Sequence, residues 1–180
     1  MTAAPDIQLA ALPDVHLARL PDAERINSDL IGAYRKVLDT GAARQTHHFF
    51  GRFENTYIDE DALPEVRPIV RFALAAARQC LGRAQLRYGF WFNEMQPGHR
   101  TSLHSHEEND EQLSAVYYVR APQDSGRLCL HDGPARIMIT PQDGLLVLFP
   151  PETPHEVEEN RAEGVRLSVA FNFGPPDVAH

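Results

Sequence analysis

The amino-acid sequence predicts a mainly β protein, a compact sandwich or barrel whose helices are confined to the first half of the chain. Short apolar or alternating runs follow Gly82, and turn-forming clusters such as QPGH, APQDSG and TPQDG separate them. The runs occupy residues 86–95, 113–120, 127–131, 136–140, 144–149 and 165–173. Strands this short and this closely spaced are typical of antiparallel β folds rather than of alternating β–α units.

Two amphipathic helices are expected ahead of these strands. Apolar residues from 22 to 38 fall on one helical stripe, with Asp22 as the expected cap and Gly41 beyond the end. A second stripe runs over 64–81, with Pro64 in its first turn. Each helix is apolar on one side only, so both are predicted to cover a sheet.

The length of 180 residues favours a single domain. Within it we distinguish a helical N-terminal part, 1–85, from a β core, 86–174. Residues 1–22 contain three prolines and no clear period, which indicates an arm or an edge strand. The aromatic, turn-rich segment 47–59 is expected to form a loop or a short strand.

Composition excludes several classes of protein. The net charge is −8 and the basic residues form no stripe, which argues against a nucleic-acid partner. No apolar run reaches membrane-spanning length, and the N-terminus lacks the pattern of a secretory signal. Cys80 and Cys129 have no paired spacing, which favours free thiols in a reducing compartment. A cytoplasmic location is therefore expected.

The stretch TSLHSHEENDEQLSAVYYV, residues 101–119, contains the strongest chemical signal. Alternate residues of a strand point to one side, so His104 and His106 can bind the same ion. Imidazole suits Fe, Cu, Zn and Ni, but two ligands do not complete a site. The third candidate is His155, which follows an apolar run and a proline-rich turn. Glu108 shares the side of the two histidines if the strand continues.

An ordered set of short segments resembles one known family. The segments are WFN (91–93), HSH (104–106), LSAVYYV (113–119), SG (125–126), GLLVLFPP (144–151), PHEV (154–157) and RLSVAFN (166–172). Their order is similar to that of the bacterial 2-oxoglutarate/Fe(II)-dependent oxygenases over about residues 88–174. The resemblance implies a double-stranded β-helix, of the jelly-roll or cupin-like type, covered by N-terminal α-helices.

The resemblance also implies roles for individual residues. His104, His106 and His155 would hold Fe(II), and no catalytic group beyond the metal ligands is expected. Arg166 matches the arginine that binds the far carboxylate of 2-oxoglutarate, and a guanidinium suits that task because its planar fork bonds a carboxylate through two hydrogens.

Further contacts are expected around the same cosubstrate. Ser168 lies two residues after Arg166 and can add a hydroxyl bond, and Tyr118 matches a position that supplies a phenol. Asn93 and His131 are candidates for contact with substrate or cosubstrate.

The sequence departs from the superfamily at one ligand. Most members use histidine, then carboxylate, then a distant histidine, whereas this chain has His106 where the carboxylate would stand. Either three histidines bind the metal, which we favour, or the register slips and His106, Glu108 and His155 bind it.

The implied activity is that of a dioxygenase. It would consume O2 and 2-oxoglutarate, release succinate and carbon dioxide, and hydroxylate a small molecule or an amino-acid-like substrate. The sequence does not identify that substrate, nor does it separate hydroxylation from desaturation, halogenation or cyclisation. Proteins with this fold often pair, so a homodimer is the expected assembly if the chain associates.

A cupin-type metalloprotein that does not use 2-oxoglutarate is the alternative: a dioxygenase, an isomerase or a small-molecule sensor. The spacing of Gly98, the two histidines and Glu111 matches the start of the first cupin motif, and the second is echoed by Gly144, Pro150 and His155. Tyr118 stands where that first motif ends in glycine. Arg166 and Ser168 have no role in a cupin, which favours the oxygenase.

Overall fold

The computed structural model describes residues 10–12, 14–49, 52–105 and 110–176. Its helices are α1 (Ala23–Leu38), the 3-10 turn η1 (Pro64–Val66) and α2 (Arg67–Leu81). The strands are β1 (Ala10–Leu12), β2 (Val15–Arg19), β3 (Arg44–Phe49), β4 (Arg52–Tyr57), β5 (Arg87–Met95), β6 (Thr101–His104), β7 (Leu113–Arg120), β8 (Leu128–Asp132), β9 (Ala135–Ile139), β10 (Leu145–Phe149), β11 (His155–Val157) and β12 (Arg166–Gly174).

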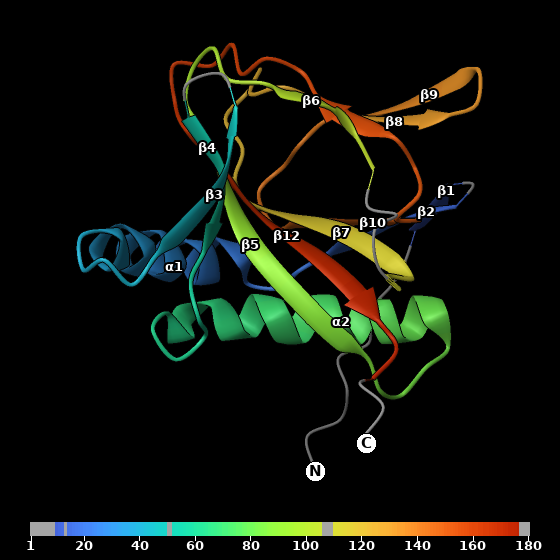
Figure 1. Cartoon of the computed structure of the whole chain (residues 1–180), viewed down its shortest axis with the longest axis horizontal. Helices are drawn as coiled ribbons and strands as arrows, with labels where there is room; N and C mark the ends of the chain where they lie inside the picture. The colour runs from blue at the N-terminus through green and yellow to red at the C-terminus, as the bar shows by residue number, and fades with distance from the viewer. Residues whose placement is uncertain (1–9, 13, 50–51, 106–109, 177–180) are drawn as a thin grey trace.

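The strands form two antiparallel sheets. The larger has the order β1-β2-β10-β7-β12-β5-β4-β3, and the smaller has the order β6-β11-β8-β9. Figure 1 shows the small sheet above the large one, with α1 and α2 beneath. Consecutive strands β7 and β8, and later β10 and β11, alternate between the two sheets, so that both sheets are built from the same stretch of chain.

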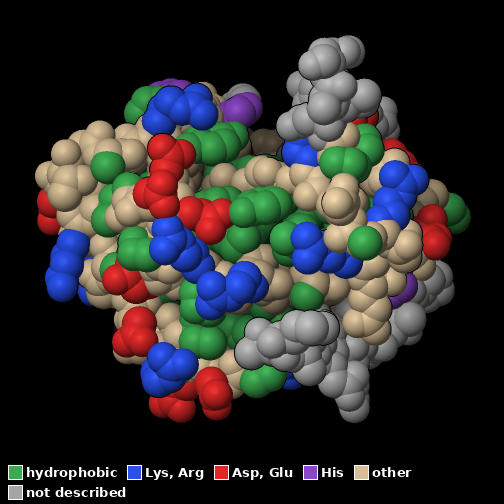
Figure 2. Space-filling view, turned by 90° about the horizontal axis from the view of Figure 1, so that it is seen from below, with side chains coloured by type: hydrophobic (Ala, Val, Ile, Leu, Met, Phe, Trp, Pro, Cys, Tyr) green, Lys and Arg blue, Asp and Glu red, His purple; other side chains and the backbone are tan. Residues whose placement is uncertain are grey.

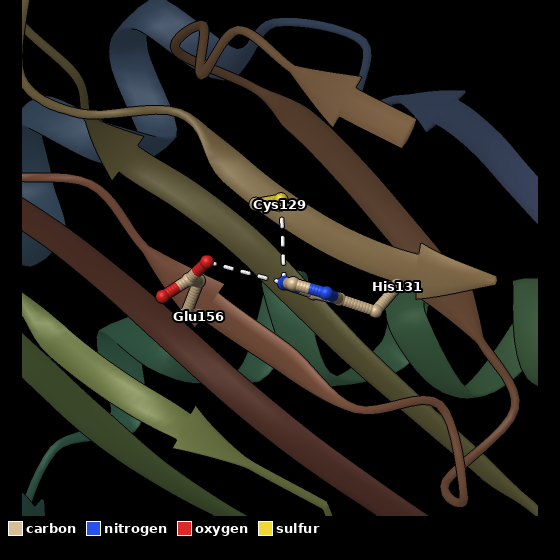
Figure 3. Close-up of side chains that lie close together, drawn as sticks. All are labelled: Cys129, His131 and Glu156. Atoms are coloured by element: carbon tan, nitrogen blue, oxygen red, sulfur yellow. Dashed lines mark hydrogen bonds and ion pairs between the residues drawn. The ribbon is translucent and has the colours of Figure 1, made fainter. Parts of the chain in front are cut away.

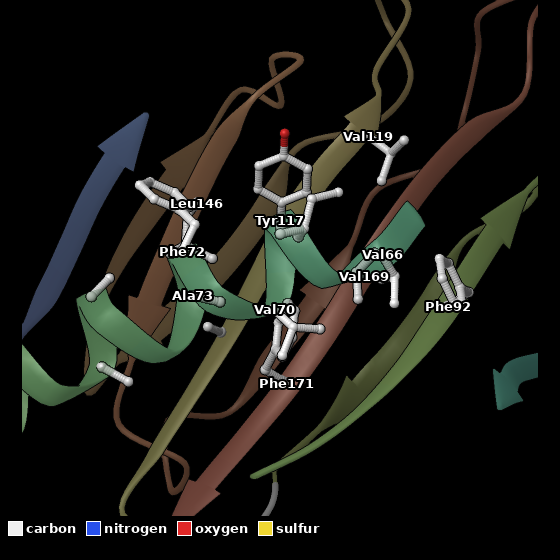
Figure 4. Close-up of a cluster of buried hydrophobic side chains, with 14 of the residues drawn as sticks. Val66, Val70, Phe72, Ala73, Phe92, Tyr117, Val119, Leu146, Val169 and Phe171 are labelled. Carbon is white, nitrogen blue, oxygen red and sulfur yellow. The ribbon is translucent and has the colours of Figure 1, made fainter. Parts of the chain in front are cut away.

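The helices cover the outer face of the large sheet through one apolar cluster. Side chains of α2, among them Val70, Phe72 and Ala73, pack against alternate residues of β7, β10 and β12 (Figure 4). The cluster includes Tyr117 from β7, and its hydroxyl donates a 2.7 Å hydrogen bond to the buried Asn27 of α1. The helical stripes predicted from sequence thus pack as one-sided covers.

A second apolar cluster lies inside the β structure. It contains Val15, Tyr118, Leu128, Leu130, Ile139, Leu145, Val147 and Phe149. Strand β7 contributes Tyr117 to the helix side and Tyr118 to this inner side, as expected for alternating side chains. Because both of its faces are covered, β7 is buried along most of its length.

The strand and helix predictions are confirmed for the elements with long apolar patterns. Helix α1 and the six predicted strands lie within one residue of their expected limits, whereas the predicted helix 64–81 divides into the 3-10 turn η1 and α2, which begins at Arg67. Asp22 precedes α1 as predicted, but it is left-handed (φ 55°) and makes no side-chain cap bond, so its expected capping role is wrong.

Four short or polar strands were missed or underestimated. In segment 47–59, predicted as a loop or a short strand, residues 47–49 and 52–57 belong to the paired strands β3 and β4. Strands β6 and β11 are four and three residues long, too short to give an apolar pattern. The N-terminal part is therefore less helical than predicted, since β1 to β4 also join the large sheet.

The helix side of the molecule carries both signs of charge. Seen from below, basic and acidic side chains alternate around hydrophobic ones without a large area of one sign (Figure 2). Within the described residues, no helix has the length and apolar character needed to cross a membrane.

Candidate active site

A cavity of about 440 Å³ opens between the two sheets. Its wall comes from both of them: β6 and β11 of the small sheet, and β5, β7 and β12 of the large one. The hairpin β3–β4 adds His47, Glu54 and Asn55 at one end. Of the predicted site residues, His104, His155, Arg166, Ser168 and Asn93 line this cavity.

Two of the three predicted metal ligands are brought together across neighbouring strands. His104 of β6 is paired in register with His155 of β11, and their ring centroids lie 4.2 Å apart. His155 is only 6% exposed, and the ring of Phe149 packs against it edge-on at 4.9 Å. His104 lies at the exposed end of its strand. The pair therefore has one buried and one solvent-facing ligand.

The second nitrogen of each ring is fixed by a backbone carbonyl. His104 Nδ1 lies 2.8 Å from the Ser102 carbonyl oxygen, and His155 Nδ1 lies 2.9 Å from that of Thr153. A carbonyl only accepts, so each Nδ1 donates and each Nε2 keeps its lone pair. Metal-binding histidines in proteins are oriented by this kind of bond, and the two side chains therefore fit a metal ion.

His106 and Glu108 lie outside the described residues. The choice between three histidines and a set that contains Glu108 therefore stays a prediction. Glu111, a ligand candidate in the cupin alternative, also lines the cavity.

Arg166 is the most deeply buried charged residue of the site, with 2% of its surface exposed. Its Nη1 donates to the carbonyl oxygen of Gly126 at 2.8 Å, whereas its Nε is buried without a hydrogen-bond partner. No carboxylate among the described residues pairs with it. Burial lowers the pKa of this guanidinium, although an arginine keeps its proton at neutral pH. A buried cation of this kind fits an anionic ligand.

The carbonyl that holds Arg166 depends on glycine. Gly126 has φ +88°, a conformation that side chains rarely adopt. A Cβ at this position would also overlap the backbone carbonyl of Glu158. The glycine of the SG pair noted in the sequence thus allows this turn to pack against the backbone of Glu158, while its carbonyl bonds the guanidinium of Arg166.

Tyr118 and Ser168 lie beside Arg166. The guanidinium carbon of Arg166 lies 4.9 Å from the centre of the Tyr118 ring, and β12 pairs Ser168 with Tyr118. The Tyr118 hydroxyl is buried without a hydrogen-bond partner. Burial raises its pKa, so the hydroxyl remains a donor at neutral pH. Tyr118 is not among the residues that line the cavity, whereas Arg166 is, and the orphaned guanidinium nitrogen of Arg166 fits a carboxylate ligand such as that of 2-oxoglutarate.

Asn93 and His131, the two candidates for substrate contact, are placed differently. Asn93 lines the cavity, and its amide donates to the Glu54 carbonyl at 2.8 Å and to Asn55 Oδ1 at 3.0 Å. His131 is not among the lining residues, and its ring instead contacts Cys129 and Glu156. Contact between His131 and a substrate in this cavity is therefore not supported.

His47 is a cavity residue that the sequence did not single out. It adopts a left-handed conformation (φ 57°), which is uncommon for residues other than glycine. Its Nδ1 lies 2.8 Å from Thr46 Oγ1 and 3.2 Å from Asn55 Nδ2, and Asn55 in turn accepts from Asn93. Only the hairpin register places His47 near Asn93, and no local motif marks it.

The two facing sheets with covering helices define a double-stranded β-helix protein, as predicted. Residues 90–174 match the family model of the 2OG-Fe(II) oxygenase superfamily. This segment contains most of β5 and the strands β6 to β12, and the match confirms the resemblance to this superfamily that the sequence predicted. Fe(II) and 2-oxoglutarate are the cofactors of that family.

Solved structures support the fold over most of the chain. A prolyl hydroxylase from Trichoplax adhaerens, in complex with a peptide of a hypoxia-inducible factor, is 16% identical with a TM-score of 0.70, covering 89% of this chain and 83% of that one. A Pseudomonas putida prolyl-4-hydroxylase is 20% identical with a TM-score of 0.66, covering 90% and 92%.

The carbocyclase SnoK from nogalamycin biosynthesis is also similar. It is 17% identical with a TM-score of 0.69, and the match covers 91% of this chain and 80% of that one. No curated protein sequence matches this chain significantly. The family match, together with the buried Arg166, disfavours the cupin alternative.

Proposed function

We propose that this protein is an Fe(II)- and 2-oxoglutarate-dependent dioxygenase that hydroxylates a small molecule or an amino-acid-like substrate. The observation that carries the proposal is Arg166, a buried guanidinium without a carboxylate partner in the described chain, at the wall of a cavity that also contains two paired histidines.

Different residues of the cavity would bind the iron and the 2-oxoglutarate. His104 and His155 would hold the iron through Nε2, with His106 as the expected third ligand. Arg166 would bind the far carboxylate of 2-oxoglutarate, with Ser168, which also lines the cavity, as a hydroxyl donor. Bound Fe(II) and 2-oxoglutarate supply the oxidation of a C–H bond by O2. The chain itself orients the reactants and limits access of water.

Cavity size supports a small substrate. Pockets for small ligands measure roughly 300–1,000 Å³ in proteins, and this one measures about 440 Å³. Proteins with this fold have been solved with ligands of both sizes: the Trichoplax enzyme with a peptide, and the epimerase SnoN with nogalamycin RO. The limited volume favours the smaller class here.

The test of the proposed function is an anaerobic titration with Fe(II) and then 2-oxoglutarate. We expect one Fe(II) per chain and a weak visible charge-transfer band that appears only when both are present. Admission of O2 should then yield succinate from 2-oxoglutarate. Tight Fe(II) binding with no charge-transfer band and no succinate would contradict the proposal and would favour the cupin alternative.

The substrate is expected to bind at the end of the cavity near the hairpin β3–β4, because the histidines would bind the iron and Arg166 would bind 2-oxoglutarate. His47→Ala should therefore raise the KM for the substrate by about 10-fold or more, through loss of one positioned polar contact. Iron binding, the charge-transfer band and slow succinate formation without substrate should be unchanged. These readouts can be compared once a substrate has been found by its stimulation of succinate formation.

The matched control is His48→Ala. His48 is the next residue of the same strand, and its ring contacts Phe53 instead of lining the cavity. Equal effects of the two replacements on KM would show that the hairpin acts only through its stability.

A further inference from the structure

Three chemically reactive side chains meet on the outer face of the small sheet. Leu128 and Leu130 of β8 belong to the inner apolar cluster, so Cys129 and His131 between and after them point the other way. On β11, Glu156 alternates with His155, which faces the cavity. Cys129 and Glu156 are direct partners across the two strands. Figure 3 shows the three side chains converging from β8 and β11.

Cys129 and Glu156 both contact the same nitrogen of His131. His131 Nε2 lies 3.6 Å from Cys129 Sγ and 3.1 Å from Glu156 Oε1. All three atoms lie within 4.8 Å of one another. Cys129 is 2% exposed, and His131 and Glu156 are half-buried.

This arrangement is not that of a nucleophilic triad. A triad uses both ring nitrogens, one toward the nucleophile and the other toward the carboxylate. Here the same Nε2 faces both the thiol and the carboxylate, so the ring cannot pass a proton between them. Burial and the nearby Glu156 also raise the pKa of the Cys129 thiol, which opposes its use as a free nucleophile.

Convergence on one point is instead what a metal ion requires. A tetrahedral zinc ion with bonds of about 2.3 Å to sulfur and about 2.0 Å to nitrogen or oxygen separates its ligands by roughly 3.6 Å (S to N) and roughly 3.3 Å (N to O). The corresponding separations here are 3.6 Å and 3.1 Å. Zinc would also place the sulfur and the carboxylate oxygen roughly 3.5 Å apart, and these atoms now lie within 4.8 Å of each other, so side-chain movements would complete the geometry.

We propose that Cys129, His131 and Glu156 bind a zinc ion on the outer face of the small sheet, with water as the fourth ligand. The mixed sulfur, nitrogen and oxygen set suits zinc, whereas the nitrogen-rich pair inside the cavity suits iron. Two neighbouring residues would then serve two metals from opposite faces of β11, His155 inside and Glu156 outside.

Nearby charges are nearly balanced around this site. Arg127 is bound to Glu158 by bonds of 2.7 and 2.8 Å, so that pair contributes little net charge. Arg136 lies across from His131 on β9 and opposes a cation. The thiolate and the Glu156 carboxylate outweigh that single charge when the metal displaces the thiol proton.

Cobalt(II) is the probe that separates this site from the active site. Cobalt bound to a thiolate gives a strong near-ultraviolet charge-transfer band, whereas cobalt held by histidine and carboxylate does not. We expect one equivalent of this band in the wild-type protein, with zinc displacing it. Zinc should also raise the thermal midpoint of unfolding by about 5 °C at a concentration well above its Kd.

Two pairs of variants test the assignment. Cys129→Ser should lose the band, and Cys80→Ser, which removes the other free thiol, should keep it. Glu156→Gln should keep the fold and weaken cobalt binding by about 10-fold to 100-fold, whereas Glu152→Gln, a change at an exposed residue of the preceding turn, should not.

The proposal is overturned by any of three results: no thiolate band in the wild-type protein, the same band in Cys129→Ser, or a band at half an equivalent that accompanies dimer formation. None of these readouts depends on iron or on turnover. A failure of the zinc proposal is therefore distinguishable from a failure of the proposed oxygenase activity.

Discussion

Replacement of His155 by alanine is expected to abolish Fe(II) binding at the active site. His155 is the buried member of the histidine pair, and its ring is held by Thr153 and Phe149. Loss of one ligand from a site of three removes several kcal/mol of metal stabilisation, which corresponds to a fall in turnover of more than about 1,000-fold. The measurement is the anaerobic charge-transfer band together with succinate formation.

His16→Ala provides the control for this replacement. His16 lies on β2, pairs with Leu148 and does not line the cavity. We expect its band and its succinate formation to equal those of the wild type. An undiminished band in His155→Ala would place the iron elsewhere and contradict the proposed ligand set.

Arg166→Met is expected to weaken 2-oxoglutarate binding by about 100-fold or more while leaving Fe(II) bound. A charge-assisted bond from a buried arginine to a carboxylate is worth several kcal/mol when its partner is left unpaired. Methionine keeps much of the apolar volume and removes only the charge and the donors. The measurement is the concentration of 2-oxoglutarate needed to develop the charge-transfer band.

Stability distinguishes this binding role from a purely structural one. Removing one partner of a buried ion pair costs about 3–5 kcal/mol, but Arg166 has no carboxylate partner among the described residues. Arg166→Met should therefore cost the ligand-free protein less than about 2 kcal/mol in urea unfolding. With Fe(II) bound, 2-oxoglutarate should stabilise the wild type and not the variant.

Arg120→Met is the matched control, since Arg120 is exposed at the end of β7. It should bind 2-oxoglutarate as the wild type does. A large loss of ligand-free stability in Arg166→Met, with unchanged affinity for 2-oxoglutarate, would contradict the role of Arg166.

The β core could be predicted because its longer strands have clear patterns. Runs such as LSAVYYV and GLLVLFPP are apolar because both faces of β7 and β10 are covered, and Gly and Pro mark the turns between them. Strands β6 and β11 escaped this approach. They are short and polar and carry the candidate metal ligands His104 and His155, and their pairing is set by the sheet rather than by their own residues.

The site could be predicted only where order along the chain encodes it. The positions of His155 and Arg166 after HSH carried the resemblance, and both line the cavity with His104. The contribution of His47 depends on hairpin register, and the cluster of Cys129, His131 and Glu156 depends on the pairing of β8 with β11. Neither arrangement leaves a local motif, because pairing partners lie far apart in sequence.

The position of β2 has a consequence for synthesis of the protein. Residues 16–19 pair with residues 145–148 of β10, one of the most apolar strands. A segment that is synthesised early therefore covers one edge of a strand that is synthesised late. A nascent chain cannot form this pair until residues 145–148 have left the ribosome. Proteolytic loss of the first twenty residues would uncover the LLVLF edge and favour aggregation between chains.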